Sequence, residues 1–179
     1  LAVSYHIFTR TNTILIDFIR DMWLYISRAI LGQKKITGET GSSTMPHKIN
    51  PIYFENAEGN CGLANAVLNH LANKLTVSRM QRDLSGSTVV RNQGVALGHS
   101  FIGLNNLIKG IDRITINQEN MRAELDKHWE VLTEAIQTIL RKNGHPDAYN
   151  KLKKLTRGSY VDQETIHKLI SDLNITTDD

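Results

Sequence analysis

Apolar residues recur at alternating steps of four and three along most of the first 111 residues, which is the period of an amphipathic helix. The first stripe comprises Leu15, Ile19, Met22, Ile26 and Ile30; the second comprises Ala57, Cys61, Ala64, Leu68, Leu71 and Leu75; the third comprises Val90, Gly94, Leu97, Phe101, Leu104, Ile108 and Ile111. We expect the first helix to run from about residue 2 to residue 31 and to stop at Gly32. Alternating strand patterns are scarce, so the chain is predicted to be all-α, a bundle of long helices packed at a shallow angle.

Long helices in a chain of 179 residues leave more apolar surface than the chain itself can cover. The second and third stripes mix Ala, Cys and Gly with Leu and Phe, a composition that lets helices approach closely. Burial alone therefore predicts that the chain associates with partner chains.

The pattern changes after Ile111, where the expected helices become short. One begins at Asn117, one runs from Trp129 to Asn143 and ends at Gly144, and a third is opened by Pro146. A last amphipathic helix is expected from Gln163 to Asp172, with Asp162 as its N-cap. We therefore predict a helical-bundle domain over residues 1–112 and a smaller all-helical domain over residues 113–179.

Composition limits the class of protein further. Hydrophobic residues make up 40% of the chain and charged residues 22%, with one cysteine and a formal charge of +3. No apolar run is long enough to span a bilayer and no secretory signal is present, so a cytoplasmic protein without a membrane partner is expected. The basic residues are spread out rather than clustered, which argues against a nucleic-acid partner.

The segment Gly41–Pro51 brings two serines, a lysine and a carboxamide together on a loop between two apolar helical segments. A serine base beside a lysine suits abstraction of a proton next to a carboxylate, because fixed donors stabilise the negative charge that then develops. Further along, Arg82 and Arg91 flank Ser87 and Thr88, and such groups can hold a phosphate or a carboxylate. We expect a helix beginning near Ser87 to add its N-terminal dipole to that site.

The loop matches the pattern G-S-S-x-M-P-x-K-x-N-P at every fixed position, and so resembles the signature of the fumarase/aspartase superfamily. His47, at the variable position between proline and lysine, resembles the adenylosuccinate lyases or the carboxymuconate cycloisomerases. The stretches 56–60, 78–84 and 87–92 are similar to the longer bacterial adenylosuccinate lyases, and the likeness extends over essentially the whole chain.

The resemblance implies a carbon–nitrogen lyase that eliminates fumarate from adenylosuccinate to give AMP, and from SAICAR to give AICAR, without a cofactor. It implies that Ser42 is the general base and that Lys48 stabilises the dianion that forms. The implied substrate-binding residues are Ser43, Lys48, Ile49, Asn50, Asn56, Arg82, Ser87, Thr88, Val89, Val90 and Arg91. For His47, a carboxylate contact and a solvated loop histidine remain equal alternatives.

The same resemblance implies that residues 1–112 are the C-terminal half of a central bundle domain, with the signature loop at residues 38–51. It also implies that the domain at residues 113–179 is incomplete. An N-terminal domain with the general-acid histidine is expected outside this chain, so the chain alone is expected to be inactive. The resemblance also implies a homotetramer whose subunits share active sites. The remaining histidines show no metal-ligand spacing, so no metal is expected. A cycloisomerase and a non-catalytic structural protein on this scaffold are the alternatives.

Overall fold

The computed structural model describes residues 1–34, 36, 50–80, 84–145, 147–158 and 161–172, and it divides the chain into two compact units, Leu1–Asn117 and Gln118–Asp179. Nearly all described residues with regular structure lie in helices, and the strands form a single two-stranded sheet. The predicted all-α fold is confirmed. Within the described residues, no helix combines the length and the apolar character that crossing a membrane requires.

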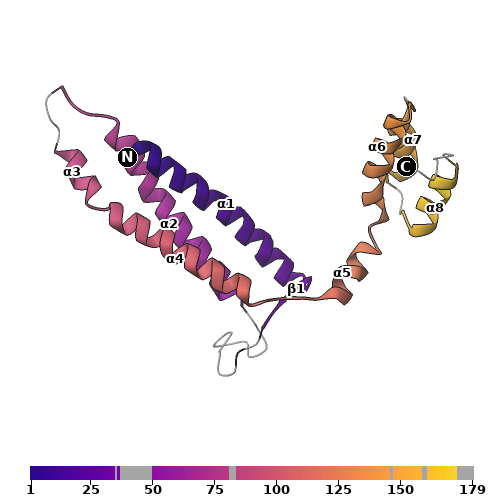
Figure 1. Ribbon diagram of the computed structural model, residues 1–179, viewed down its shortest axis with the longest axis horizontal. Helices are drawn as coiled ribbons and strands as arrows, with labels where there is room; N and C mark the ends of the chain where they lie inside the picture. The colour runs from indigo at the N-terminus through magenta and orange to yellow at the C-terminus, as the bar shows by residue number, and fades with distance from the viewer. Residues whose placement is uncertain (35, 37–49, 81–83, 146, 159–160, 173–179) are drawn as a thin grey trace. The chain divides into compact units, whose positions relative to one another are not determined.

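Three long helices run side by side in the first unit, α1 (Ala2–Ser27), α2 (Ile52–Leu75) and α4 (Gln93–Asp112) (Figure 1). A short helix, α3 (Ser85–Val90), precedes α4. The cross-helix contacts fix their directions. Asn12 meets Asn65 and Arg20 meets Glu58, so α1 and α2 are antiparallel, whereas contacts of Tyr5 with Gln93 and of Asn12 with Ser100 make α1 and α4 parallel.

The first two predicted stripes form the core of this unit, as expected. All members of the second stripe up to Leu71 are fully buried, and Leu75 packs against the same core. From α1, Ile19 is buried and Leu15, Met22 and Ile26 pack around it, next to Phe54 of α2. The helix α2 packs along both α1 and α4, whereas α1 and α4 contact each other little, so α2 is the central helix of the three.

The prediction for the third stripe is wrong. The buried residues of α4 are Ala96, Ser100, Gly103, Leu107 and Gly110, which form a seam displaced by one residue from the predicted one. Phe101 is 67% exposed and Ile108 is 49% exposed. Small residues line the seam because α2 and α4 approach closely: a methyl group on Gly103 would come within 2.7 Å of the Cys61 sulfur. A turn at Arg91 and Asn92 also separates α3 from α4.

The predicted end of the first helix is also wrong, because α1 ends at Ser27 instead of continuing to Gly32. Ala29 has a φ of 55°, and the N–H groups of Ala29 and Ile30 donate to the carbonyls of Ile26 and Tyr25. This is a Schellman motif with alanine in the position that usually holds glycine. The sequence therefore carried no glycine signal at the real end of the helix.

Gly32 instead lies in a short strand, β1 (Leu31–Gln33), which pairs antiparallel with β2 (Ile114–Ile116). Gly32 is opposite Thr115, and a Cβ atom at Gly32 would lie 2.6 Å from the Thr115 hydroxyl oxygen. The glycine thus permits the close approach of the two strands. This pairing joins the end of α1 to the end of α4.

A buried polar cluster connects the three long helices. Asn12 is buried and its amide nitrogen donates to Asn65 Oδ1 (3.0 Å) and to Ser100 Oγ (2.9 Å), while the Asn65 amide donates to Thr13 Oγ1 (3.2 Å). Because each buried polar group needs a partner, these bonds favour one register of α1 against α2 and α4.

The second unit consists of short helices: α5 (Gln118–Leu125), the 3₁₀ turn η1 (Trp129–Val131), α6 (Leu132–Lys142), α7 (Ala148–Thr156) and α8 (Gln163–Asp172). Its core comprises Ile136, Leu140, Leu152, Val161, Ile166 and Leu169, with Trp129 packed against it. Gly144 has a φ of 79° and ends α6, as predicted. The predicted N-cap of α8 is confirmed, since Asp162 Oδ1 accepts the Thr165 N–H at 2.8 Å.

Candidate functional site

The segment that carries the predicted base begins and returns at one end of the first unit. Ser42, Ser43, Lys48 and Ile49 lie outside the described residues, as does Arg82. Before the segment, the Lys34 N–H donates to the Arg113 carbonyl (2.8 Å) and Lys34 Nζ donates to the Asp112 carbonyl (2.9 Å). After it, Asn50 is half-buried and Pro51 is buried immediately before α2. Both ends of the signature segment are therefore held by the helical unit.

Polar and aromatic contacts fix the first turns of α2, the helix that follows the signature. The Arg113 guanidinium lies 4.5 Å from the ring centre of Tyr53. The indole N–H of Trp23 donates to Glu55 Oε1 at 3.0 Å, and Arg20 pairs with Glu58 at 2.8 Å. The last pair is exposed, so it contributes little stability, but together the contacts set the rotation of α2 against its neighbours.

Asn56, the predicted substrate contact on α2, lies in the second turn of that helix and is exposed. Its side-chain oxygen accepts hydrogen bonds from Asn60 and Asn106, both at 2.9 Å. Asn60 in turn contacts His99. The sequence did not indicate that Asn60, Asn106 and His99 form a network with Asn56. The four-residue step from Asn56 to Asn60 was visible, but the positions on α4 depend on a packing register that we misassigned.

The second predicted group, Ser87 to Arg91, lies on and just after α3. The helix expected to begin near Ser87 is α3, which begins two residues earlier, at Ser85, and has only six residues. Ser87 Oγ donates to the Leu84 carbonyl at 2.7 Å. Val89 packs against the core of the first unit, whereas Thr88 and Arg91 are exposed. Exposed hydroxyl and guanidinium groups at this place are available to a ligand.

Within one chain, the two predicted groups lie at opposite ends of the bundle. Asn50 and Asn56 lie at the start of α2, but α3 packs at its end, where a Cβ atom placed on Gly86 would lie 3.9 Å from the Leu75 side chain (Figure 1). The helical distance from Asn56 to Leu75 is about 28 Å at 1.5 Å per residue. One substrate molecule of nucleotide size cannot reach both groups in the same chain.

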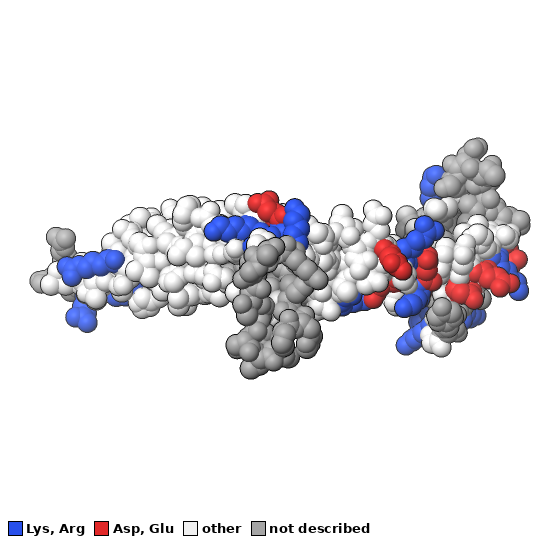
Figure 2. Space-filling view, turned by 90° about the horizontal axis from the view of Figure 1, so that it is seen from below, with Lys and Arg blue, Asp and Glu red and all other residues white. Residues whose placement is uncertain are grey.

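Charged side chains are unevenly distributed on the surface of the first unit. In the view of Figure 2, basic side chains lie towards both of its ends, and the surface between them is largely uncharged. Among the exposed residues of α4 are Phe101, Leu104, Ile108 and Ile111, which repeat at steps of three and four and so form one apolar stripe. The bundle thus has polar ends and an apolar flank.

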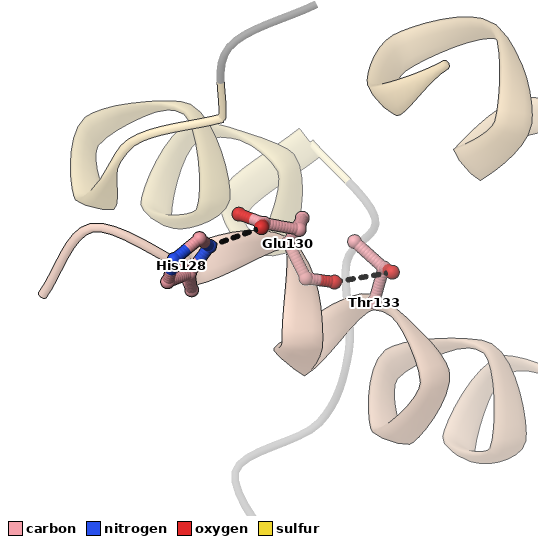
Figure 3. Close-up of polar contacts among 3 residues, drawn as sticks. All are labelled: His128, Glu130 and Thr133. Atoms are coloured by element: carbon pink, nitrogen blue, oxygen red, sulfur yellow. Dashed lines mark hydrogen bonds and ion pairs between the residues drawn. The ribbon is translucent and has the colours of Figure 1, made fainter. Parts of the chain in front are cut away.

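Two other chemically notable groups have structural explanations. The Cys61 thiol is buried between α2 and α4, and burial raises its pKa, which disfavours the nucleophilic thiolate. In the second unit, His128 Nδ1 lies 2.7 Å from Glu130 Oε1, and Thr133 Oγ1 donates to the Glu130 carbonyl at 2.6 Å (Figure 3). The bond to His128 lowers the pKa of Glu130, but both side chains are about half exposed and belong to a local turn. Among the described residues, no cluster of His, Cys, Asp or Glu could hold a metal ion.

The helical fold and the signature segment place the chain in a class of lyases, and residues 2–65 match a family described simply as "Lyase". Residues 78–179, more than half of the chain, match the family described as "Adenylosuccinate lyase C-terminal". The chain belongs to the adenylosuccinate lyase family.

Curated relatives named adenylosuccinate lyase are similar along nearly the entire chain. The Legionella pneumophila (strain Corby) protein is 54% identical over 98% of this chain, and the Escherichia coli (strain K12) protein is 53% identical over 97%. The Vibrio cholerae protein is 51% identical over 100%. In each case the match covers only 38% or 39% of the relative, so this chain spans less than two fifths of the length of these proteins.

Proposed function

We propose that this chain is the part of an adenylosuccinate lyase that supplies the signature loop and one phosphate- or carboxylate-binding segment. The reaction is β-elimination of fumarate from adenylosuccinate to give AMP, and from SAICAR to give AICAR. The observation that carries the proposal is the identity of more than half of the residues with curated adenylosuccinate lyases over nearly the whole chain. No relative named above supports the cycloisomerase or a non-catalytic role.

In the proposed mechanism, Ser42 removes the proton from the carbon beta to the departing nitrogen. Negative charge then develops on the adjacent carboxylate, where Lys48, Ser43 and Asn50 stabilise it, because preorganised donors act most strongly on the charge of the transition state. Asn56 and the backbone at Ile49 complete the binding of the succinyl group. The leaving nitrogen takes its proton from a histidine outside this chain, and no cofactor takes part.

The nucleotide part of the substrate is bound by Arg82, Ser87, Thr88, Val89, Val90 and Arg91. Guanidinium groups bind phosphate in bidentate geometry, and the hydroxyls and backbone N–H groups of this segment add shorter-range donors. Because this segment and Asn56 lie at opposite ends of α2, we propose that each active site takes them from different copies of the chain.

A homotetramer is the proposed assembly. It is supported by the apolar stripe on α4 and by a second exposed apolar stripe on α1, which includes Ile7, Ile14 and Phe18. Contiguous exposed apolar surface of this kind marks an interaction site. Helices from several copies, packed through these stripes, would bring opposite ends of different chains together. We place the enzyme in the cytoplasm, where purine nucleotides are made.

The test is turnover by an enzyme of full length, for example the E. coli protein with its matching segment replaced by this chain. It should convert adenylosuccinate to AMP and fumarate. Ser42→Ala should lower kcat by about 10²- to 10⁴-fold, as loss of a positioned base does, while AMP still binds. Lys48→Met should lower both kcat and kcat/KM. An inactive parent enzyme would overturn the proposed function, and an unchanged kcat in Ser42→Ala would overturn the assignment of the base.

A further inference from the structure

The carboxamide of Asn56 is fixed by hydrogen bonds that its side-chain oxygen accepts. Asn60 Nδ2 and Asn106 Nδ2 each donate to Asn56 Oδ1 at 2.9 Å, and Asn60 Nδ2 also donates to the Asn56 backbone carbonyl at 2.8 Å. Asn106 is itself fixed, since its amide nitrogen also donates to the Ile102 carbonyl at 2.9 Å. Two donors on one oxygen permit only one orientation of the Asn56 amide, with Oδ1 towards them.

The side chains of Asn60 and His99 are likewise fixed in one orientation. Asn60 Nδ2 is used as a donor, so Asn60 Oδ1 is an acceptor, and it lies 2.8 Å from His99 Nδ1. His99 therefore carries a proton on Nδ1 and donates it to Asn60. The chain from His99 through Asn60 to Asn56 has a single consistent direction of donation.

As a result, both N–H groups of Asn56 remain for another acceptor. Asn56 is exposed, and its amide donates to none of the described residues. It lies on the helix that directly follows the signature segment, close to Asn50 in sequence. Carboxylates accept such N–H groups readily, and a dicarboxylate is the proposed leaving product.

We propose that Asn60, His99 and Asn106 are positioning residues that fix the orientation of the Asn56 carboxamide, so that its N–H groups donate to a substrate carboxylate. This inference rests on the proposed function. It goes beyond a contact between Asn56 and the substrate, because it states which atom of Asn56 makes the contact and which side chains on α2 and α4 determine it.

The alternative is that the network only joins α2 to α4. Asn56→Asp separates the two, because aspartate has the same shape and still accepts from Asn60 and Asn106, but it has no N–H to donate. We expect kcat/KM in the full-length enzyme to fall about 10- to 100-fold, the loss typical of a hydrogen bond to a charged group. The thermal stability of Asn56→Asp should stay close to that of the parent.

Asn69→Asp is the matched control. Asn69 is also exposed on α2 and the same atoms change, but it lies more than three turns from Asn56 and outside the network. We expect less than a twofold change in kcat/KM. Equal losses in the two variants would show a general effect of the added charge and would overturn the inference.

His99 provides a test by rescue. His99→Leu removes the donor to Asn60 and should lower kcat/KM about 3- to 10-fold, mostly through KM, as expected for the loss of one neutral hydrogen bond. In His99→Asn, the amide nitrogen occupies nearly the place of Nδ1 and should restore most of the loss. Failure of asparagine to do better than leucine would overturn the role of His99.

A measurement without turnover keeps this inference separate from the proposed function. Fumarate affinity, measured by calorimetry on the same full-length proteins, should fall at least tenfold in Asn56→Asp and stay unchanged in Asn69→Asp. If the parent turns over adenylosuccinate but Asn56→Asp binds fumarate as tightly as the parent, the inference fails and the proposed function stands. If the parent is inactive yet the affinities differ as expected, only the proposed function fails. A parent that binds no fumarate would overturn the inference as well.

Discussion

At the scale of single residues, the same helix-terminating motif occurs twice with different residues in its left-handed position. Gly144 ends α6 with a φ of 79°, and Ala29 ends α1 with a φ of 55°. In both, the N–H groups of the left-handed residue and of the residue after it donate to carbonyls of the last helical turn. Glycine adopts this conformation without a steric penalty, whereas the Cβ atom of alanine comes too close to the following carbonyl oxygen.

Substitutions at these two positions should therefore have opposite effects. Gly144→Ala should lower the free energy of unfolding by about 1 kcal/mol, and Ala29→Gly should raise it by about 0.5 kcal/mol, because relief of strain is partly offset by the entropy of glycine in the unfolded chain. Urea denaturation of the two variants measures both values. A change of the same sign in both would contradict the conformations assigned to Ala29 and Gly144.

The cap of α8 makes a specific prediction on pH. The Asp162 carboxylate accepts from the N–H and the hydroxyl of Thr165, and these bonds lower its pKa in the folded state. A lowered folded pKa means that the contribution to stability is present above the unfolded pKa, about 3.9, and is lost as the pH falls through the folded value.

Protection of the α8 amides from hydrogen exchange should thus decrease as the pH falls below about 4. Asp162→Asn keeps an acceptor for the Thr165 N–H but cannot titrate, so it should remove this part of the pH dependence. An identical pH profile in Asp162→Asn would show that another group is responsible.

At the scale of elements, close packing of α2 against α4 depends on two glycines. A Cβ on Gly103 would lie 2.7 Å from Cys61 Sγ and 3.3 Å from the Ala57 carbonyl oxygen, and one on Gly110 would lie 3.0 Å from the Phe54 ring. Contacts this short require one helix to move, and a well-packed core resists such movement.

Gly103→Ala should therefore lower the free energy of unfolding by about 1–3 kcal/mol, the usual cost of overpacking. Gly98→Ala is the matched control on the same helix, since nothing lies within 4 Å of its Cβ position. Because alanine has a higher helix propensity than glycine, Gly98→Ala should leave the free energy of unfolding unchanged or raise it by up to about 1 kcal/mol. Equal effects of the two variants in urea denaturation would contradict the packing.

These glycines also explain which elements could be predicted from sequence. On α1 and α2 the predicted stripe is the one that packs in the core, so both were predicted correctly, apart from Ile30, which lies beyond the end of α1. On α4 the bulky residues Phe101, Leu104 and Ile108 form the more hydrophobic stripe, so hydrophobicity selects them. The buried seam instead consists mostly of small residues, because only these fit against α2. The sequence shows both stripes but does not show which one meets α2 within the chain.

The candidate site, too, could be predicted from the sequence only in part. The signature motif identifies Ser42, Lys48 and Asn50 from their spacing, and their roles stay predictions, as do those of Arg82 and the residues up to Arg91. The partners of Asn56 were not predictable, since Asn106 and His99 contact the network only through the packing of α4 on α2. Which copy of the chain supplies each group is likewise a property of the assembly, and the division into domains after residue 112 stays a prediction.

At the scale of the whole molecule, the apolar stripe on α4 should determine assembly. Phe101→Gln combined with Ile108→Gln should reduce the size of the full-length enzyme measured by light scattering, because both side chains would be buried between copies. Leu125→Gln combined with Val131→Gln changes apolar residues of the second unit that are at least as exposed as Ile108, and it should leave the size unchanged. An unaltered assembly in the α4 variant would exclude this stripe as the interface.

The central claim is that one active site combines the signature loop of one copy with the Ser87–Arg91 segment of another. The most direct measurement is complementation between two full-length variants, Ser42→Ala and Arg91→Ala, each of which should have little activity alone. Co-refolded in equal amounts, they should regain about a quarter of the parental turnover, because random mixing gives that fraction of sites an intact loop and an intact arginine. Activity of the mixture no greater than that of the separate variants would contradict the shared site.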